Sequence, residues 1–188
     1  RTILERFPLA AVEDEARLLD ANIRHDFLTR IFTLAAFRQA KASGRMRDLV
    51  QFQAENKYLL MSYNEQETRE MGNIIANHEQ RSLDEVVREY QIHLARALAE
   101  PPGLKSSINV LMHALGYFSE KLSREERAFF LETVQDYRNK RIPMSVCTAI
   151  LKSWIARFGE EYLRQQTFFE PYPAQLVQVT DPGKGRDI

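Results

Sequence analysis

Residues 82–103, SLDEVVREYQIHLARALAEPPG, contain the signals of a complete amphipathic helix and decide the fold class. Ser82 followed three residues later by Glu85 forms a capping-box pattern, in which each side chain satisfies a backbone N–H of the first turn. Apolar residues then recur at steps of three and four, which places them on one face: Val86, Tyr90, Leu94 and Ala97. The helix is expected to stop before Pro101-Pro102-Gly103, because proline cannot continue the backbone hydrogen bonds.

The same signals recur along most of the chain. Capping-box spacing appears again at Asn64/Glu67 and Ser123/Glu126, a first helix is expected from Asp20, and Gly44 and Gly159 are expected to end helices. Apolar stripes at helical spacing accompany these signals: Ile23, Phe27, Ile31 and Leu34; Leu49, Phe52, Leu59 and Leu60; Ile108, Leu111, Met112, Leu115 and Phe118; Phe130, Val134 and Tyr137; Val146, Ile150, Trp154 and Phe158. We therefore predict an all-α protein, a bundle or array of about seven helices without strands.

Three parts of the chain differ in composition. Residues 1–19 read as a non-helical lead-in, and residues 20–176 as the helical domain. This domain ends in an extended aromatic and proline-rich tail from Phe168 onward, which is predicted to lie on the surface of the bundle. Residues 177–188 are predicted to be mobile. Because the first residue is Arg1 rather than Met, we expect the chain to be part of a longer protein.

Composition limits the classes of partner. The 188 residues are 44% hydrophobic, which suits a single domain with a real core. Basic and acidic residues number 26 each, so an anionic partner must be met by a local patch. No apolar run approaches the ~20 residues that span a bilayer, so no membrane partner is predicted. The single cysteine, Cys147, rules out an internal disulfide and fits the reducing cytoplasm.

No set of catalytic or metal-binding side chains can be read from the spacing. The four histidines, His25, His78, His93 and His113, lack the short His or Glu spacings that helical metal sites use. Cys147 lies within an amphipathic stretch, where a free cysteine is usually a small buried hydrophobe. We therefore predict no catalytic residue, no metal site and no cofactor held by this chain itself.

Two basic clusters suggest contacts with phosphate. Arg38, Lys41, Arg45 and Arg47 fall within ten residues that contain no acid, and Arg138, Lys140 and Arg141 follow Tyr137. Such clusters can follow a phosphate backbone, and aromatic side chains nearby can stack on exposed bases. The alternative is a solvated surface, since cations near helix C-termini also complement the helix dipole.

Four ordered motifs carry a family resemblance. They are FQAENKYLLMSYNEQETREMG (52–72), NVLMHALGYF (109–118), DYRNKRIP (136–143) and the stretch 162–173, and together they resemble the helical domain of the YbgA-like family over about residues 45–176. The lead-in, with Phe7-Pro8, VEDEARL (12–18) and FLTRIF (27–32), is similar to the end of thiouracil desulfurase domains. The resemblance implies an upstream desulfurase domain that holds an iron–sulfur cluster, and a helical half that grips RNA, tRNA in particular, for removal of sulfur from thiouridine.

Individual residues match or depart from the family pattern. Lys57, Asn109, His113 and Arg138 agree with it, whereas Gln53, Asn56, Tyr63 and Ser107 stand where family members commonly have histidine. We expect Lys57 and Arg138 to contact phosphate, Asn109 and His113 to hydrogen-bond, and Tyr137 or Tyr117 to stack.

Two other functions stay open at this point. One is a structural or partner-docking module that presents Phe168, Phe169 and Tyr172 to a neighbouring domain or a second copy. The other is an independent enzyme built around Lys57 and His113, which lacks a visible nucleophile, base and orienting group. The sequence leaves the oligomeric state open.

Overall fold

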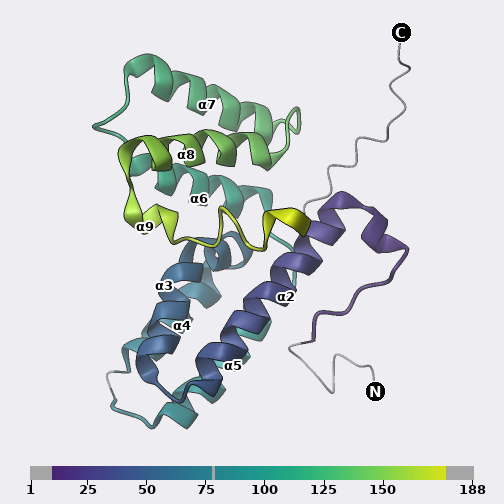
Figure 1. The fold of residues 1–188 in the computed structure, drawn as a ribbon, viewed down its shortest axis with the longest axis vertical. Coiled ribbons are helices and arrows are strands. Elements are labelled where there is room, and N and C mark those ends of the chain that lie inside the picture. Colours follow the sequence, from purple (N-terminus) through teal and green to yellow (C-terminus); the bar gives the residue numbers. More distant parts are fainter. Residues whose placement is uncertain (1–9, 78, 177–188) are drawn as a thin grey trace.

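The computed structural model describes residues 10–77 and 79–176, which fold into helices and connecting turns without any strand among them (Figure 1). The elements follow in this order: η1 (Arg17–Leu19), α2 (Ala21–Ala42), α3 (Met46–Tyr63), α4 (Glu65–Ala76), α5 (Leu83–Ala97), α6 (Leu104–Gly116), α7 (Arg124–Arg138), α8 (Met144–Phe158), α9 (Glu161–Arg164) and η2 (Ala174–Leu176). The predicted all-α class is confirmed, and the short α9 adds one turn that was not predicted. The prediction for residues 177–188 lies outside the described residues.

The helices form two packed groups (Figure 1). In the first group α2 packs on α3, α3 on α4 and α4 on α5; in the second, α6, α7 and α8 pack on one another. The contact between α3 and α6 joins the groups. After α8 the chain turns through α9 and runs back toward the beginning of α2. No described helix is both long and apolar enough to cross a membrane.

Side-chain caps explain where several helices begin. Asp20 caps α2 by accepting from the backbone N–H groups of Asn22 and Ile23. Complete capping boxes are present at the starts of α5 and α7, as the sequence predicts. These starts confirm the predicted helix boundaries at three separate points of the chain.

The capping box predicted at Asn64 and Glu67 is only half formed. The Asn64 side chain does accept from the Glu67 N–H, at 3.0 Å. However, the Asn64 N–H donates to the Leu60 carbonyl at 2.8 Å because it also ends α3. Glu67 therefore has no orphan N–H to satisfy, and its carboxylate contacts His93 Nδ1 at 2.6 Å instead.

Apolar and aromatic side chains fill the core of both groups. The predicted stripe of α8 is confirmed at Trp154, Ile150 and Phe158 but is wrong at Val146, which is exposed while its neighbour Cys147 is fully buried. Val146 sits in the first turn of α8, whereas Cys147 faces α7 and its thiol donates to the Thr133 carbonyl. Two aromatic clusters anchor the groups: Phe37, Phe52 and Tyr90 in the first, and Phe118, Phe130 and Trp154 in the second.

The segment after α9, residues 165–176, ties the two groups together, and we call it the C-terminal strap. The Gln166 side chain spans a helical hydrogen-bond position of α3: its Nε2 donates to the Ala54 carbonyl at 2.8 Å, and its Oε1 accepts from the Tyr58 N–H at 3.1 Å. Beside it the Thr167 N–H donates to the Glu55 carbonyl at 3.0 Å. These bonds attach the strap to the middle of α3.

The predicted surface tail is in fact packed against its own helices. Phe168 is buried, only 6% exposed, and Phe169 is half-buried. Tyr172 lies against His25 and Phe32 of α2, and its hydroxyl is 2.7 Å from His25 Nδ1. Folding the strap onto α2 removes apolar ring surface from water, which is more favourable than leaving it extended.

Candidate functional site

Helices α3 and α6 meet along a seam that brings two of the sequence motifs together. At one end the Ser106 hydroxyl donates to the Ser62 carbonyl at 2.7 Å. At the other end the Tyr117 hydroxyl adjoins the hydroxyl of Tyr58. Residues 106 and 117 are three helical turns apart, so α6 presents one continuous face to α3. Lys57 of α3 and His113 of α6 are exposed residues of these two helices.

A stacked pair of tyrosines lies at the second end of the seam. The rings of Tyr117 and Tyr162 are 5.4 Å apart at an interplanar angle of 11°, and Tyr58 meets Tyr162 edge-on at 6.0 Å. Burial raises the pKa of Tyr58 and of Tyr162, so both hydroxyls stay neutral near pH 7. Tyr117 is 41% exposed. The result is a flat, neutral aromatic surface supported from beneath by a buried ring.

Three residues of the family pattern lie on α3 and α6, the helices next to this tyrosine pair. Exposed His113 lies one turn before Tyr117 on α6, and exposed Lys57 is the neighbour of Tyr58 on α3. Asn109, one turn further back, donates to Glu65 Oε2 at 3.3 Å. Within residues 10–77 and 79–176, neither Lys57 nor His113 forms an ion pair. We call the set of Lys57, Asn109, His113, Tyr117 and Tyr162 the tyrosine surface.

The first basic cluster lies at the connection between α2 and α3, and all four of its cations are exposed. An acidic residue just outside the cluster offsets part of its charge: Asp48 lies 2.7 Å from Arg45 Nη2 and 3.3 Å from Arg47 Nε. Lys41 Nζ donates to Gln91 Oε1 of α5 at 3.1 Å, which leaves its charge intact. The remaining cation, Arg38, projects from the last turns of α2.

The second basic cluster follows α7. Arg138, Lys140 and Arg141 are all exposed, and Arg141 lies 3.1 Å from Asp136 Oδ1. Tyr137 is half-buried against the core, with the Ser107 side chain at its hydroxyl, so its ring is less open to stacking than that of Tyr117. The α7–α8 and α2–α3 connections lie toward opposite ends of the molecule (Figure 1). The structure therefore does not join the two basic clusters into one patch.

The four positions where the family resemblance expects histidine are all buried and hydrogen-bonded. Gln53 accepts from the Tyr90 hydroxyl at 2.5 Å, and Asn56 Nδ2 donates to the Phe52 carbonyl at 2.8 Å. The Tyr63 hydroxyl donates to Asp26 Oδ1 at 2.6 Å. Ser107 lies beneath Tyr137. Buried polar groups need partners, and each of these four has one. Gln53, Tyr63 and Ser107 contact another helix, whereas Asn56 donates within α3.

A partly buried histidine–carboxylate pair escaped the sequence reasoning. His93 Nδ1 of α5 lies 2.6 Å from Glu67 Oε2 of α4, and each side chain is 18% exposed. Such a pair orients the imidazole ring. The two residues are 26 positions apart on different helices, so local spacing gave no signal for them.

The described residues offer few other groups for chemistry. No cluster of three His, Cys, Asp or Glu within this part of the chain could hold a metal ion. Cys147 is fully buried, and burial raises the pKa of its thiol. One surface hollow opens over Asp14–Leu19 and another between α8, α9 and the strap, and neither is lined by Lys57 or His113. The independent-enzyme hypothesis therefore gains no support from these groups.

Comparison with known proteins places the chain in a family. The family described as "Protein of unknown function (DUF1722)" matches residues 57–173, more than half of the chain. The chain is also 27% identical over 148 residues to "Uncharacterized protein YbgA" of Escherichia coli (strain K12), a match that covers 78% of this chain and 88% of that protein. No solved structure gives a significant match. The matched region runs from Lys57 in α3 to Pro173 in the strap. The chain therefore contains a YbgA-like helical domain and belongs to the DUF1722 family.

Proposed function

We propose that this domain binds structured RNA, with tRNA as the expected ligand, through the tyrosine surface. The observation that carries the proposal is the stacked Tyr117/Tyr162 pair, in which Tyr117 is 41% exposed and exposed His113 lies one helical turn before it. Proteins hold unpaired bases by stacking them on aromatic rings, and each stacked base is worth roughly 1–3 kcal/mol. A neighbouring cation adds a phosphate contact.

The two basic clusters supply the second part of the proposal. Each retains exposed cations beyond those that its own aspartate offsets: Arg38 and Lys41 in the first, and Arg138 and Lys140 in the second. Because the clusters lie toward opposite ends of the molecule (Figure 1), a ligand that touches both must be long. A folded tRNA meets this requirement better than a nucleotide or a short single strand does.

The biological setting of the proposal comes from the resemblance of the lead-in. Its likeness to the end of thiouracil desulfurase domains suggests that the domain serves a tRNA thiouridine-removing protein in the bacterial cytoplasm. The upstream desulfurase domain would be its covalent partner, and the iron–sulfur cluster would be held there. In this arrangement the present chain contributes RNA binding and the upstream domain contributes the chemistry.

The test is a filter-binding titration of the chain with bulk tRNA, with polyglutamate as an acidic control polymer. We expect saturable, salt-sensitive binding to tRNA, and a loss of about tenfold or more in Tyr117→Ala. Phe129→Ala is the matched control, since Phe129 is an exposed ring on α7, outside the tyrosine surface. Equal affinity for tRNA and polyglutamate, or an equal loss in both variants, refutes the proposal.

The structure weakens the partner-docking alternative. It relied on free aromatic side chains in the tail, and Phe168 is buried while Tyr172 packs on α2. It remains a hypothesis, but the described residues give it no aromatic surface of the kind it required.

A further inference from the structure

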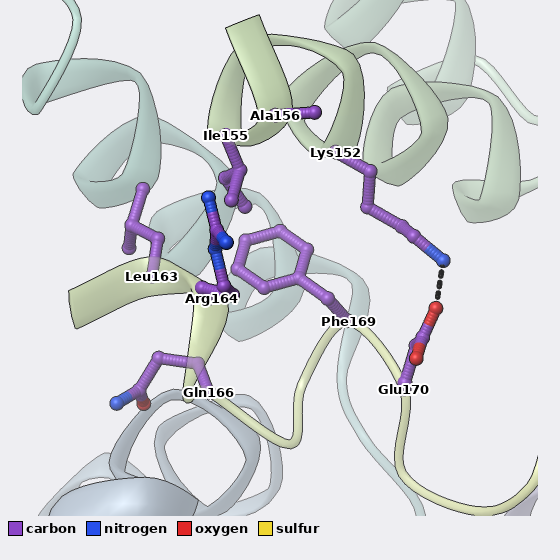
Figure 2. A pocket seen from close by; sticks show the side chains of 8 residues that line it. All are labelled: Lys152, Ile155, Ala156, Leu163, Arg164, Gln166, Phe169 and Glu170. Carbon is purple, nitrogen blue, oxygen red and sulfur yellow. Dashed lines mark hydrogen bonds and ion pairs between the residues drawn. The ribbon is translucent and has the colours of Figure 1, made fainter. Parts of the chain in front are cut away.

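A surface pocket of about 420 Å³ opens between α8, α9 and the C-terminal strap (Figure 2). Its floor is apolar, because buried Ile155 and Leu163 line it together with half-buried Phe169. Exposed Ala156 forms part of its wall. This volume falls within the range of small-molecule sites, which are usually apolar with a few polar groups at the edge.

The wall made by the strap is fixed in place before any ligand arrives. Gln166 lines the pocket while its amide is bonded to the Ala54 carbonyl and the Tyr58 N–H of α3. Phe168 is buried and packs edge-on against Phe169 at 5.4 Å. Because these contacts hold the strap, the Phe169 ring is presented to the pocket without an ordering cost at the time of binding.

Cations dominate the rim of the pocket. Lys152 and Arg164 line it together with one carboxylate, Glu170, which pairs with Lys152 across the opening (Figure 2). The nearest acidic partner of Arg164 is Glu161, at 3.6 Å from Nε, and this leaves the other guanidinium donors available. A planar guanidinium beside an apolar floor suits an anionic group attached to a flat apolar body.

We propose that this pocket binds a small planar anion, with its ring against Phe169 and its phosphate or carboxylate on Arg164 and Lys152. The ligand chemistry is that of an aryl phosphate or carboxylate, which a nucleoside monophosphate shares. Binding an anion on Lys152 replaces the Lys152–Glu170 contact, so that pair acts as a gate at the mouth. The residues that line the site are not those of the tyrosine surface, and the proposal does not depend on RNA binding.

Isothermal titration of the whole chain tests the site with phenyl phosphate, uridine 5′-monophosphate and inorganic phosphate. We expect at least one of the two ring-bearing phosphates to bind about tenfold or more tighter than inorganic phosphate. Tighter binding of the uridine nucleotide identifies a nucleotide ligand, and tighter binding of phenyl phosphate identifies a simple aryl anion. Failure of both to bind saturably at millimolar concentration overturns the proposal.

Variants locate the binding in this pocket. Arg164→Gln removes the cation and should weaken binding about tenfold, because the charge-assisted hydrogen bonds to the anion are lost. Ala156→Trp fills the pocket from an exposed helical position and should abolish binding without unfolding the chain, which circular dichroism checks. Arg127→Gln is the control: Arg127 is an exposed cation of α7 outside the pocket, and its loss should leave binding unchanged. Binding that is equal in Arg164→Gln and the unmodified chain refutes the site, whatever Ala156→Trp shows.

Discussion

At the scale of single residues, the Gln166 side chain links the strap to α3. It is 3% exposed and satisfies one backbone acceptor and one backbone donor of α3. Gln166→Ala removes two hydrogen bonds between the strap and α3, so we expect the free energy of unfolding to fall by about 1–3 kcal/mol, at about 0.5–1.5 kcal/mol for each bond. Urea denaturation followed by circular dichroism measures this loss.

The neighbouring residue provides the control for Gln166. Gln165 is exposed and bonds only to Glu161 within its own short helix turn. Gln165→Ala should change the free energy of unfolding by no more than about 0.5 kcal/mol. Equal free energies of unfolding for the two variants would show that the hydrogen bonds of Gln166 to α3 do not stabilise the fold.

Cys147 allows a second prediction at this scale. Its thiol is fully buried, and burial raises its pKa, so the reactive thiolate is scarce in the folded chain. We expect an aromatic disulfide reagent to label it at the rate of opening of the fold, and to label it at once in urea. Immediate labelling of the native chain would show that α8 does not pack as described.

Some roles of single residues can be predicted from the sequence and others cannot. The burial of Cys147 could be predicted, since the residue lies inside an amphipathic stretch. The roles of Gln166 and of the His93–Glu67 pair could not, because their partners lie far away in sequence on other helices. Polar residues that satisfy distant backbone groups leave no periodic pattern.

At the scale of helices, Glu126 connects the beginning of α7 to α8. Its carboxylate accepts from the Ser123 N–H at 2.8 Å and from Arg157 Nη1 at 2.6 Å. The Ser123 N–H first, and then Arg157, hold the pKa of Glu126 below its usual value of 4.5. A carboxyl whose pKa is lower in the folded state stabilises the fold above its unfolded pKa and loses this effect as the pH falls.

The lowered pKa of Glu126 predicts how the stability of the chain depends on pH. Glu126→Gln should lower the urea midpoint at pH 7, and the difference from the unmodified chain should shrink below about pH 4 as the carboxyl is protonated. Glu132→Gln, an exposed change on the same helix, should show no such pH-dependent difference. A gap for Glu126→Gln that stays constant from pH 7 to pH 3 would contradict the assigned contacts.

Helix positions were the most predictable feature of the chain. Capping boxes at Ser82 and Ser123 and apolar spacing gave the correct starts of α5 and α7, because both signals are local. The errors arose from tertiary contacts. Asn64 had to end α3 as well as begin α4, and the aromatic tail had α2 to pack against.

At the scale of the whole molecule, the two helix groups meet at the α3–α6 seam, and the tyrosine surface lies at its end. Sequence reasoning named Lys57, Asn109 and His113 from the resemblance and offered Tyr117 as a stacking residue. It could not find Tyr162, since a stacked pair on α6 and α9 depends on how the chain folds back after α8. Nor could it show that the basic clusters lie apart (Figure 1).

If RNA binds the tyrosine surface by stacking and by phosphate contact, the two contributions should separate in the salt dependence of tRNA binding. The slope of log affinity against log salt should fall in magnitude by about 1 in Lys57→Gln, because one phosphate contact is lost. Tyr117→Leu should weaken binding at every salt concentration without changing the slope, and Arg127→Gln should change neither. Identical lines for the unmodified chain, Lys57→Gln and Tyr117→Leu would contradict the claim.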